Sequence, residues 1–226
     1  MQTGSLDPAD KRRLGLFLVV LALIVGWDLP ILLPLRILVV VFHEAGHALM
    51  TLATGGEVLA VSVSPDEGGL TMSRGGSRLL ILNGGYLGSI AAGVVLLRLA
   101  RSDGRGRPML ALLGLVLVGA ALVWFRPILS FGFFYALLGG ALLVLLAARV
   151  RHQVADWIVR TVGLFSLLYG LLDVKSDVLD HGLQAGAVRS DAAMLAEATG
   201  VPALVWGLGW VVVGLLLVLR LRRHIF

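Results

Sequence analysis

An H-E-x-x-H motif inside an apolar run constrains this chain more than any other stretch. Residues 39–49 read Val-Val-Val-Phe-His-Glu-Ala-Gly-His-Ala-Leu, which places His43, Glu44 and His47 among apolar and small neighbours. On a helix, residues four apart share one face, so both imidazoles can reach one cation while Glu44 approaches the open coordination position. The run is therefore expected to be a helix that carries a metal site.

The residue types of the motif match the needs of hydrolysis. Two neutral imidazoles, His43 and His47, hold one Zn²⁺ per chain, and the cation lowers the pKa of a bound water to about 7. Glu44 then takes the proton of that water as general base. Ionisable side chains within a membrane-spanning helix are costly unless paired or liganded, which makes them functional candidates. The motif therefore predicts a zinc metallopeptidase.

The composition indicates a multi-pass membrane protein. Of the 226 residues, 58% are hydrophobic and 15% are charged, and the mean hydropathy is +0.93, far above that of a soluble domain. The chain has no cysteine, so only histidine and carboxylate can bind the metal. Its net charge of +5 comes from arginines at the ends of apolar runs, where lipid headgroups would receive them. We expect a protein of the cell membrane that contacts the lipid bilayer and no nucleic acid.

Apolar runs predict an all-α fold with about seven transmembrane helices. The runs are residues 14–27, 35–54, 79–99, 108–125, 128–148, 161–172 and 201–219. Residues 57–78 follow the zinc helix and place strand formers on both sides of a turn at 65–69. A small β-hairpin is expected there, with an edge that could pair with an extended substrate peptide. A solvated loop is the alternative.

Two further segments complete the expected organisation. The third run opens with small residues at 84, 85, 88, 89 and 93, which permit close packing on the zinc helix. Residues 189–200 read as a short amphipathic helix with Ser190 or Asp191 as N-cap and Gly200 as its stop. We interpret residues 1–226 as a single integral-membrane metallopeptidase domain. Its core covers about 35–180, between a polar segment at 1–13 and a polar loop at 182–200.

A second cluster of chemically active residues follows the sixth run. Asp173, Asp177 and His181 recur four residues apart and would share one helical face. Asp173 follows the apolar run directly, and a solvated charge is hardest to explain there. It is the predicted third metal ligand, with Asp177 as the alternative.

The pairing of His43-Glu44-Ala45-Gly46-His47 with an aspartate after Leu171-Leu172 resembles the site-2 protease family of intramembrane zinc metallopeptidases. The resemblance implies that His43, His47 and Asp173 bind zinc and that Glu44 is the catalytic base. Val174 replaces the glycine that follows the family's aspartate, which leaves Asp177 open as the ligand. The implied substrate is a membrane protein.

The resemblance covers roughly residues 35–180. Residues 84–89 occupy the place of the family's small-residue G-P-x-A-N segment, although only loosely. The chain is similar to the compact members, which have no PDZ domain. The oligomeric state is not predicted.

Two other functions fit parts of the same pattern. A prenyl-protein-type membrane protease also uses H-E-x-x-H, with a downstream glutamate as third ligand, and Glu197 is the candidate for that role. A metal-binding scaffold or transporter would keep the fold without proteolysis. The intact Glu44 argues against that reading, since metal storage needs no base.

The charges give conflicting signals on membrane orientation. If Lys11-Arg12-Arg13 keep the N-terminus cytoplasmic, the zinc motif lies near the cytoplasmic face, as the family arrangement implies. The arginines around 98–107, 149–151 and 220–223 would then lie on the opposite side, against the positive-inside rule. We expect the family arrangement.

Overall fold

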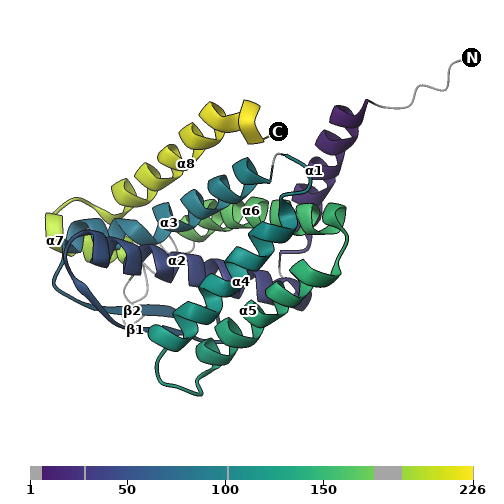
Figure 1. Ribbon diagram of the computed structural model, residues 1–226. Helices are drawn as coiled ribbons and strands as arrows, with labels where there is room; N and C mark the ends of the chain where they lie inside the picture. Colours follow the sequence, from purple (N-terminus) through teal and green to yellow (C-terminus); the bar gives the residue numbers. More distant parts are fainter. Residues whose placement is uncertain (1–6, 28, 101, 176–189, 226) are drawn as a thin grey trace, which may run out of the picture.

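The computed structural model describes residues 7–27, 29–100, 102–175 and 190–225 (Figure 1). Its helices are α1 (Pro8–Val25), α2 (Leu33–Ala53), α3 (Arg78–Leu99), α4 (Gly106–Val123), α5 (Phe131–Arg149), α6 (His152–Lys175), α7 (Asp191–Thr199) and α8 (Ala203–Ile225). A 3₁₀ turn, η1 (Pro30–Leu32), precedes α2, and the strands β1 (Glu57–Val63) and β2 (Gly69–Arg74) follow it. The predicted all-α membrane fold with a hairpin after the motif helix is confirmed.

Five helical segments of the described chain are long and apolar enough to cross a membrane. They are Pro30–Ala53, Arg78–Leu99, Gly106–Val123, Phe131–Arg149 and Ala203–Arg220. In α1 the apolar part, Leu14–Val25, is shorter than a membrane span. Helix α6 is more polar and is not one of the five segments. The prediction of about seven spans therefore holds only approximately, although α6 runs through the bundle with Phe165 fully buried.

Glycines allow α2, α3 and α6 to pack closely at the centre of the bundle. A Cβ on Gly46 of α2 would overlap the backbone of Gly84 in α3, and one on Gly93 would lie 2.8 Å from the carbonyl oxygen of Gly163 in α6. Small residues of this kind let two backbones approach without the hindrance of side chains. The predicted packing of the small-residue segment on the zinc helix is confirmed.

The hairpin has one covered edge and one open edge. β1 pairs antiparallel with β2, with Val61 opposite Thr71. On its other side, the Val61 N–H donates to the Trp124 carbonyl (2.7 Å), and the Arg126 N–H donates to the Val61 carbonyl (2.9 Å). The segment between α4 and α5 therefore pairs with β1 through a single parallel β-bridge between Val61 and Phe125. No strand of the described chain pairs with the outer edge of β2, and the solvated-loop alternative is excluded.

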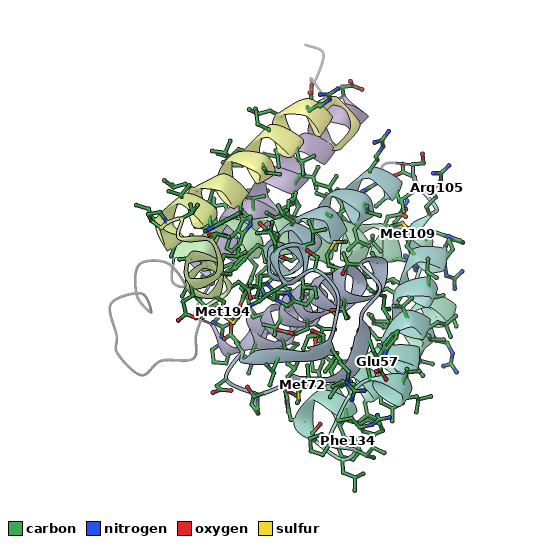
Figure 2. All side chains as sticks on the ribbon, turned by 90° about the vertical axis from the view of Figure 1, so that its left-hand side faces the viewer. Glu57, Met72, Arg105, Met109, Phe134 and Met194 are labelled. Atoms are coloured by element: carbon green, nitrogen blue, oxygen red, sulfur yellow. The ribbon has the colours of Figure 1, made fainter. Side chains whose placement is uncertain are left out.

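Contacts at its turn hold the hairpin against the bundle. A carboxylate oxygen of Glu67 lies 3.3 Å from Nε of Arg36 in α2, and its other oxygen accepts a hydrogen bond from the Tyr169 hydroxyl of α6 (3.3 Å). In Figure 2, Glu57 and Met72 of the hairpin and Phe134 of α5 all lie in the lower part of the view, below Arg105 and Met109 at the start of α4. The hairpin thus sits at the end of the bundle where α4 ends and α5 begins.

Helix α1 runs along α6 in the same direction. Gly15 lies against the ring of Trp157, and Trp27 stacks on Phe165 with 5.3 Å between ring centroids. Because residue number rises along both helices at these contacts, α1 begins at the same end of the bundle as α6. Figure 1 shows the N-terminal and C-terminal parts of the chain together on the upper right.

Candidate metal centre

The motif histidines are brought together by one turn of α2. The Nε2 atoms of His43 and His47 lie 3.0 Å apart, with His47 buried and His43 partly exposed. Their spacing follows from the helical repeat, which stacks residues i and i+4 on one face. The structure therefore brings the two imidazole nitrogens together, as the i, i+4 spacing predicts.

A hydrogen bond from α3 fixes the orientation of His47. Its Nδ1 lies 2.7 Å from the carbonyl oxygen of Ile81. A carbonyl oxygen can only accept, so Nδ1 carries the hydrogen and a neutral His47 presents a lone pair on Nε2. Histidines that bind metals are held in the same way, through a second nitrogen that donates to a backbone carbonyl or a carboxylate.

A carboxylate from the short helix α7 completes the cluster. Oδ2 of Asp191 lies 3.0 Å from Nε2 of His43 and 3.1 Å from Nε2 of His47. Burial by itself would raise the pKa of Asp191, but hydrogen bonds from the two imidazoles outweigh it and hold that pKa below its usual range. The side chain is therefore an anion that faces two imidazole nitrogens.

From the sequence alone, Asp191 is expected only as one of two possible helix caps. The structure assigns that role to Ser190, whose hydroxyl accepts a hydrogen bond from the Ala193 N–H (3.2 Å). One capping residue suffices to start a helix. The second polar residue at this boundary was therefore the sequence signal that Asp191 has a role other than capping. The side chain of Asp191 is only 8% exposed, and nothing in the sequence predicted that it is buried.

A single cation among the three donor atoms would satisfy all of them at once. With a hydrogen of His47 on Nδ1, its Nε2 can donate to Asp191 only when the ring is a protonated imidazolium, whereas a neutral ring directs a lone pair at the carboxylate. A single proton bridges two atoms, whereas here three atoms lie 3.0–3.1 Å apart from one another. A metal ion that accepts three lone pairs would fit this arrangement.

Glu44 stands beside this cluster and is held by the hairpin. Ligand atoms of His43, Glu44 and His47 lie within 4.8 Å of one another. The Thr71 hydroxyl of β2 donates to Oε2 of Glu44 (2.6 Å), and Gly69 packs so close to that carboxylate that a Cβ would overlap it. β2 therefore touches the predicted base directly.

Aromatic packing from α3 and α8 supports the opposite side of the histidine pair. The edge of His43 meets Tyr86 at 4.7 Å between ring centroids, and Tyr86 stacks on Trp210 at 4.5 Å. The indole N–H of Trp210 donates to Oδ1 of Asn83 (2.8 Å). These contacts position the ring of His43 from a helix far away in the sequence.

The predicted ligands Asp173 and Asp177 fall outside the side chains that the structure describes. Asp173 lies in the last turn of α6, in the part of that helix whose side chains the structure does not describe. Asp177 and His181 fall outside the described residues. Glu197 is exposed on α7, on the far part of the helix that carries Asp191. Asp173 and Asp177 therefore stay predictions.

Comparison with known proteins agrees with this geometry. The model of the Peptidase M50B-like family matches residues 16–220, which include every residue of the cluster. No curated protein and no solved structure matches the chain significantly. The family match confirms the resemblance to site-2 proteases and extends over nearly the whole chain. The chain is thus an integral membrane protein that belongs to the Peptidase M50B-like family of metallopeptidases.

Proposed function

We propose that the protein is a zinc endopeptidase that hydrolyses a peptide bond in or beside a transmembrane segment of another membrane protein. The observation that carries this proposal is the convergence of two imidazoles and one carboxylate at 3.0–3.1 Å, with Glu44 beside them. Family membership supports the same reaction class. His43, His47 and Asp191 are the proposed ligands of one Zn²⁺ per chain.

The donor atoms fit zinc in kind and in spacing. In a tetrahedral site with bonds of about 2.0–2.1 Å, ligand atoms lie about 3.3 Å from one another. The observed separations of 3.0–3.1 Å therefore require shifts of only a few tenths of an ångström. Three protein ligands leave the fourth position open, as in catalytic rather than structural zinc sites.

The chain's own residues divide the work of hydrolysis. When bound, zinc acidifies a water molecule and polarises the carbonyl of the scissile bond. Glu44 takes the proton of that water and can return it to the leaving amine. Thr71 holds the carboxylate of Glu44 in place through its hydroxyl (2.6 Å), so the base does not have to be ordered at the moment of reaction.

The open edge of β2 is the proposed dock for the substrate. Val61 directs its N–H and C=O away from β2, toward residues 124–126, so Val61 and Thr71 form a non-hydrogen-bonded pair. The N–H and C=O of Thr71 therefore point to the open edge, and alternation extends this to Ser73. An extended peptide that pairs with β2 would lie next to Glu44.

Two alternatives are less well supported. The prenyl-protein-type reading needs Glu197 at the metal, whereas the carboxylate beside the histidines belongs to Asp191. A scaffold or transporter would need no base, and Glu44 is buried, hydrogen-bonded and beside the histidines. The position of Asp191 therefore argues against the first alternative, and the setting of Glu44 argues against the second.

Replacing the base tests the reaction itself. Glu44→Gln should keep zinc, because the three proposed ligands remain, and should lower peptide hydrolysis by at least about 100-fold, since no carboxylate accepts the proton. Zinc content and cleavage of membrane-anchored substrates by purified protein are the measurements. A zinc-loaded variant with normal activity would remove Glu44 from its role.

Zinc content also decides between the two candidate third ligands. Asp191→Ala should lose most of its zinc, because two imidazoles alone leave the site open on two sides. Asp173→Ala should lose at most the factor of about 10–100 typical of a group that only orients a ligand. Asp66→Ala, which removes an exposed carboxylate of the hairpin turn, serves as the control and should keep its zinc. An empty Asp173→Ala beside a loaded Asp191→Ala would restore the assignment made from the sequence.

Gly85 offers a test that leaves every ligand in place. A Cβ at Gly85 would overlap Nε2 of His43 and lie 2.6 Å from Nε2 of His47. Gly85→Ala should therefore lower the zinc affinity by at least about tenfold, because His47 is held by Ile81 and cannot retreat freely. Gly139→Ala is the matched control, since nothing lies within 4 Å of its Cβ. Equal affinity in both variants would contradict the proposed cation position.

Proline at the open edge tests the substrate dock. Ser73→Pro removes an N–H that points away from β1, so the hairpin and the zinc should persist. Loss of one backbone hydrogen bond to the peptide, about 0.5–1.5 kcal/mol, predicts a fall in kcat/KM of up to about tenfold. Ser73→Ala, which keeps the N–H, should cleave normally. If both variants cleave alike, the substrate does not pair at this position.

A further inference from the structure

Exposed arginines gather where several helices end or begin. Arg98 lies in the last turn of α3, Arg105 directly precedes α4, and Arg149 ends α5. Arg151 directly precedes α6, and all four are exposed. The loops that join these helices are short, which is the condition under which such charges influence membrane orientation.

Contacts place these helix ends on one side of the molecule. Nε of Arg160 in α6 donates to the Ala100 carbonyl after α3 (3.1 Å), and Nε of Arg107 in α4 donates to the Ala147 carbonyl of α5 (2.7 Å). The ends of α3 and α5 therefore meet the starts of α6 and α4. We call this side of the molecule the basic end.

Both outer helices bring their charged parts to the same place. Leu16 of α1 shares a buried cluster with Leu97 of α3, against which Leu217 of α8 also packs. The start of α1, with Lys11-Arg12-Arg13, and the last turns of α8, with the exposed Arg220, therefore lie at the basic end. Figure 1 shows these helix ends together on the right and α7 and the hairpin on the left.

Among the cations at the metal-centre end, Arg74 and Arg126 have local partners, and Arg78 at the start of α3 is exposed. Arg74 pairs with Glu57 (3.5 Å), and Arg126 donates to the Phe125 carbonyl (2.7 Å) and to carbonyls in the last turn of α4. Carboxylates are also present, including the fully exposed Asp66. This end therefore has no comparable excess of positive charge among the described residues.

We propose that the basic end lies at the cytoplasmic face, against the anionic headgroups of that leaflet, and that the metal centre lies toward the opposite side of the membrane. Positive residues in short loops are retained on the cytoplasmic side, and anionic lipids attract them there. The sequence expectation placed the motif near the cytoplasm because it counted α1 as a complete crossing. Because α1 and α6 run parallel, Lys11-Arg12-Arg13 lie on the same side of the membrane as the arginines of the basic end. The two groups of charges then indicate the same orientation.

The absence of cysteine from the chain allows a direct test. Asp66→Cys and Ala198→Cys place one exposed thiol each on the hairpin turn and on α7. Ser102→Cys and Gln153→Cys place exposed thiols at the basic end. The full-length variants are produced in a bacterial host, and spheroplasts are treated with a membrane-impermeant maleimide before and after permeabilisation. We expect the first pair to react at once and the second pair only after permeabilisation.

The opposite labelling pattern, or labelling of all four variants in intact spheroplasts, would overturn the proposal. So would failure of both Asp66→Cys and Ala198→Cys to react before permeabilisation. Labelling depends on position alone, so its outcome is independent of whether the protein hydrolyses peptides.

A second variant set tests the cause of the orientation. Replacing Arg98, Arg105, Arg149 and Arg151 together with Gln should give a mixed orientation, because the charges that hold this end at the cytoplasm are removed. Arg74→Gln, at the metal-centre end, is the control and should label as the unchanged protein does. An unchanged orientation in the fourfold variant would exclude these charges as its cause.

Discussion

Close contact between α2 and α3 is the constraint on which the metal centre depends. Gly46, Gly84 and Gly88 remove the side chains that would keep the two backbones apart. That approach brings the Ile81 carbonyl within 2.7 Å of Nδ1 of His47 and sets Gly85 against the Nε2 atoms of the histidine pair. The same contact therefore orients the imidazole of His47. It also leaves room beside the histidine pair for a glycine at position 85 and for no larger residue. A motif on α2 alone would present two mobile rings, which bind a metal far less well than oriented ones.

The remaining parts of the centre arrive from distant segments of the chain. The carboxylate of Asp191 comes from a helix of nine residues that shares a buried cluster with α3 and α8 through Leu195, Tyr86 and Trp210. Glu44, the proposed base, is held by the Thr71 hydroxyl of the hairpin. The proposed ligands and base thus lie on α2 and α7, and the edge that would receive a peptide lies on β2. Each element is fixed by packing that does not involve the metal.

The sequence predicted those features that have a periodic or compositional signal. The i, i+4 spacing of His43 and His47, the hairpin at 57–78 and the small-residue face of α3 are such features, and the structure has them. Asp191 was missed because a carboxylate next to a helix cap looks the same in sequence whether it faces water or a histidine pair. The direction of α1 relative to α6 has no signal in the sequence, because an apolar run does not show which helix it packs against. Only its contacts with Trp157 and Phe165 reveal that it runs parallel to α6.

Thr71 joins two tasks in one residue, since its hydroxyl holds Glu44 while its peptide group faces the open edge of β2. A dock of this shape accepts a chain only after the chain has given up its own helical hydrogen bonds. In a bilayer that exchange is costly, because no water replaces the broken bonds. Selection would then fall on how easily a transmembrane helix unwinds, more than on the side chains around the cut. Helices weakened by glycine, proline or β-branched residues would be admitted, and the stable helices that make up most of the membrane would be spared.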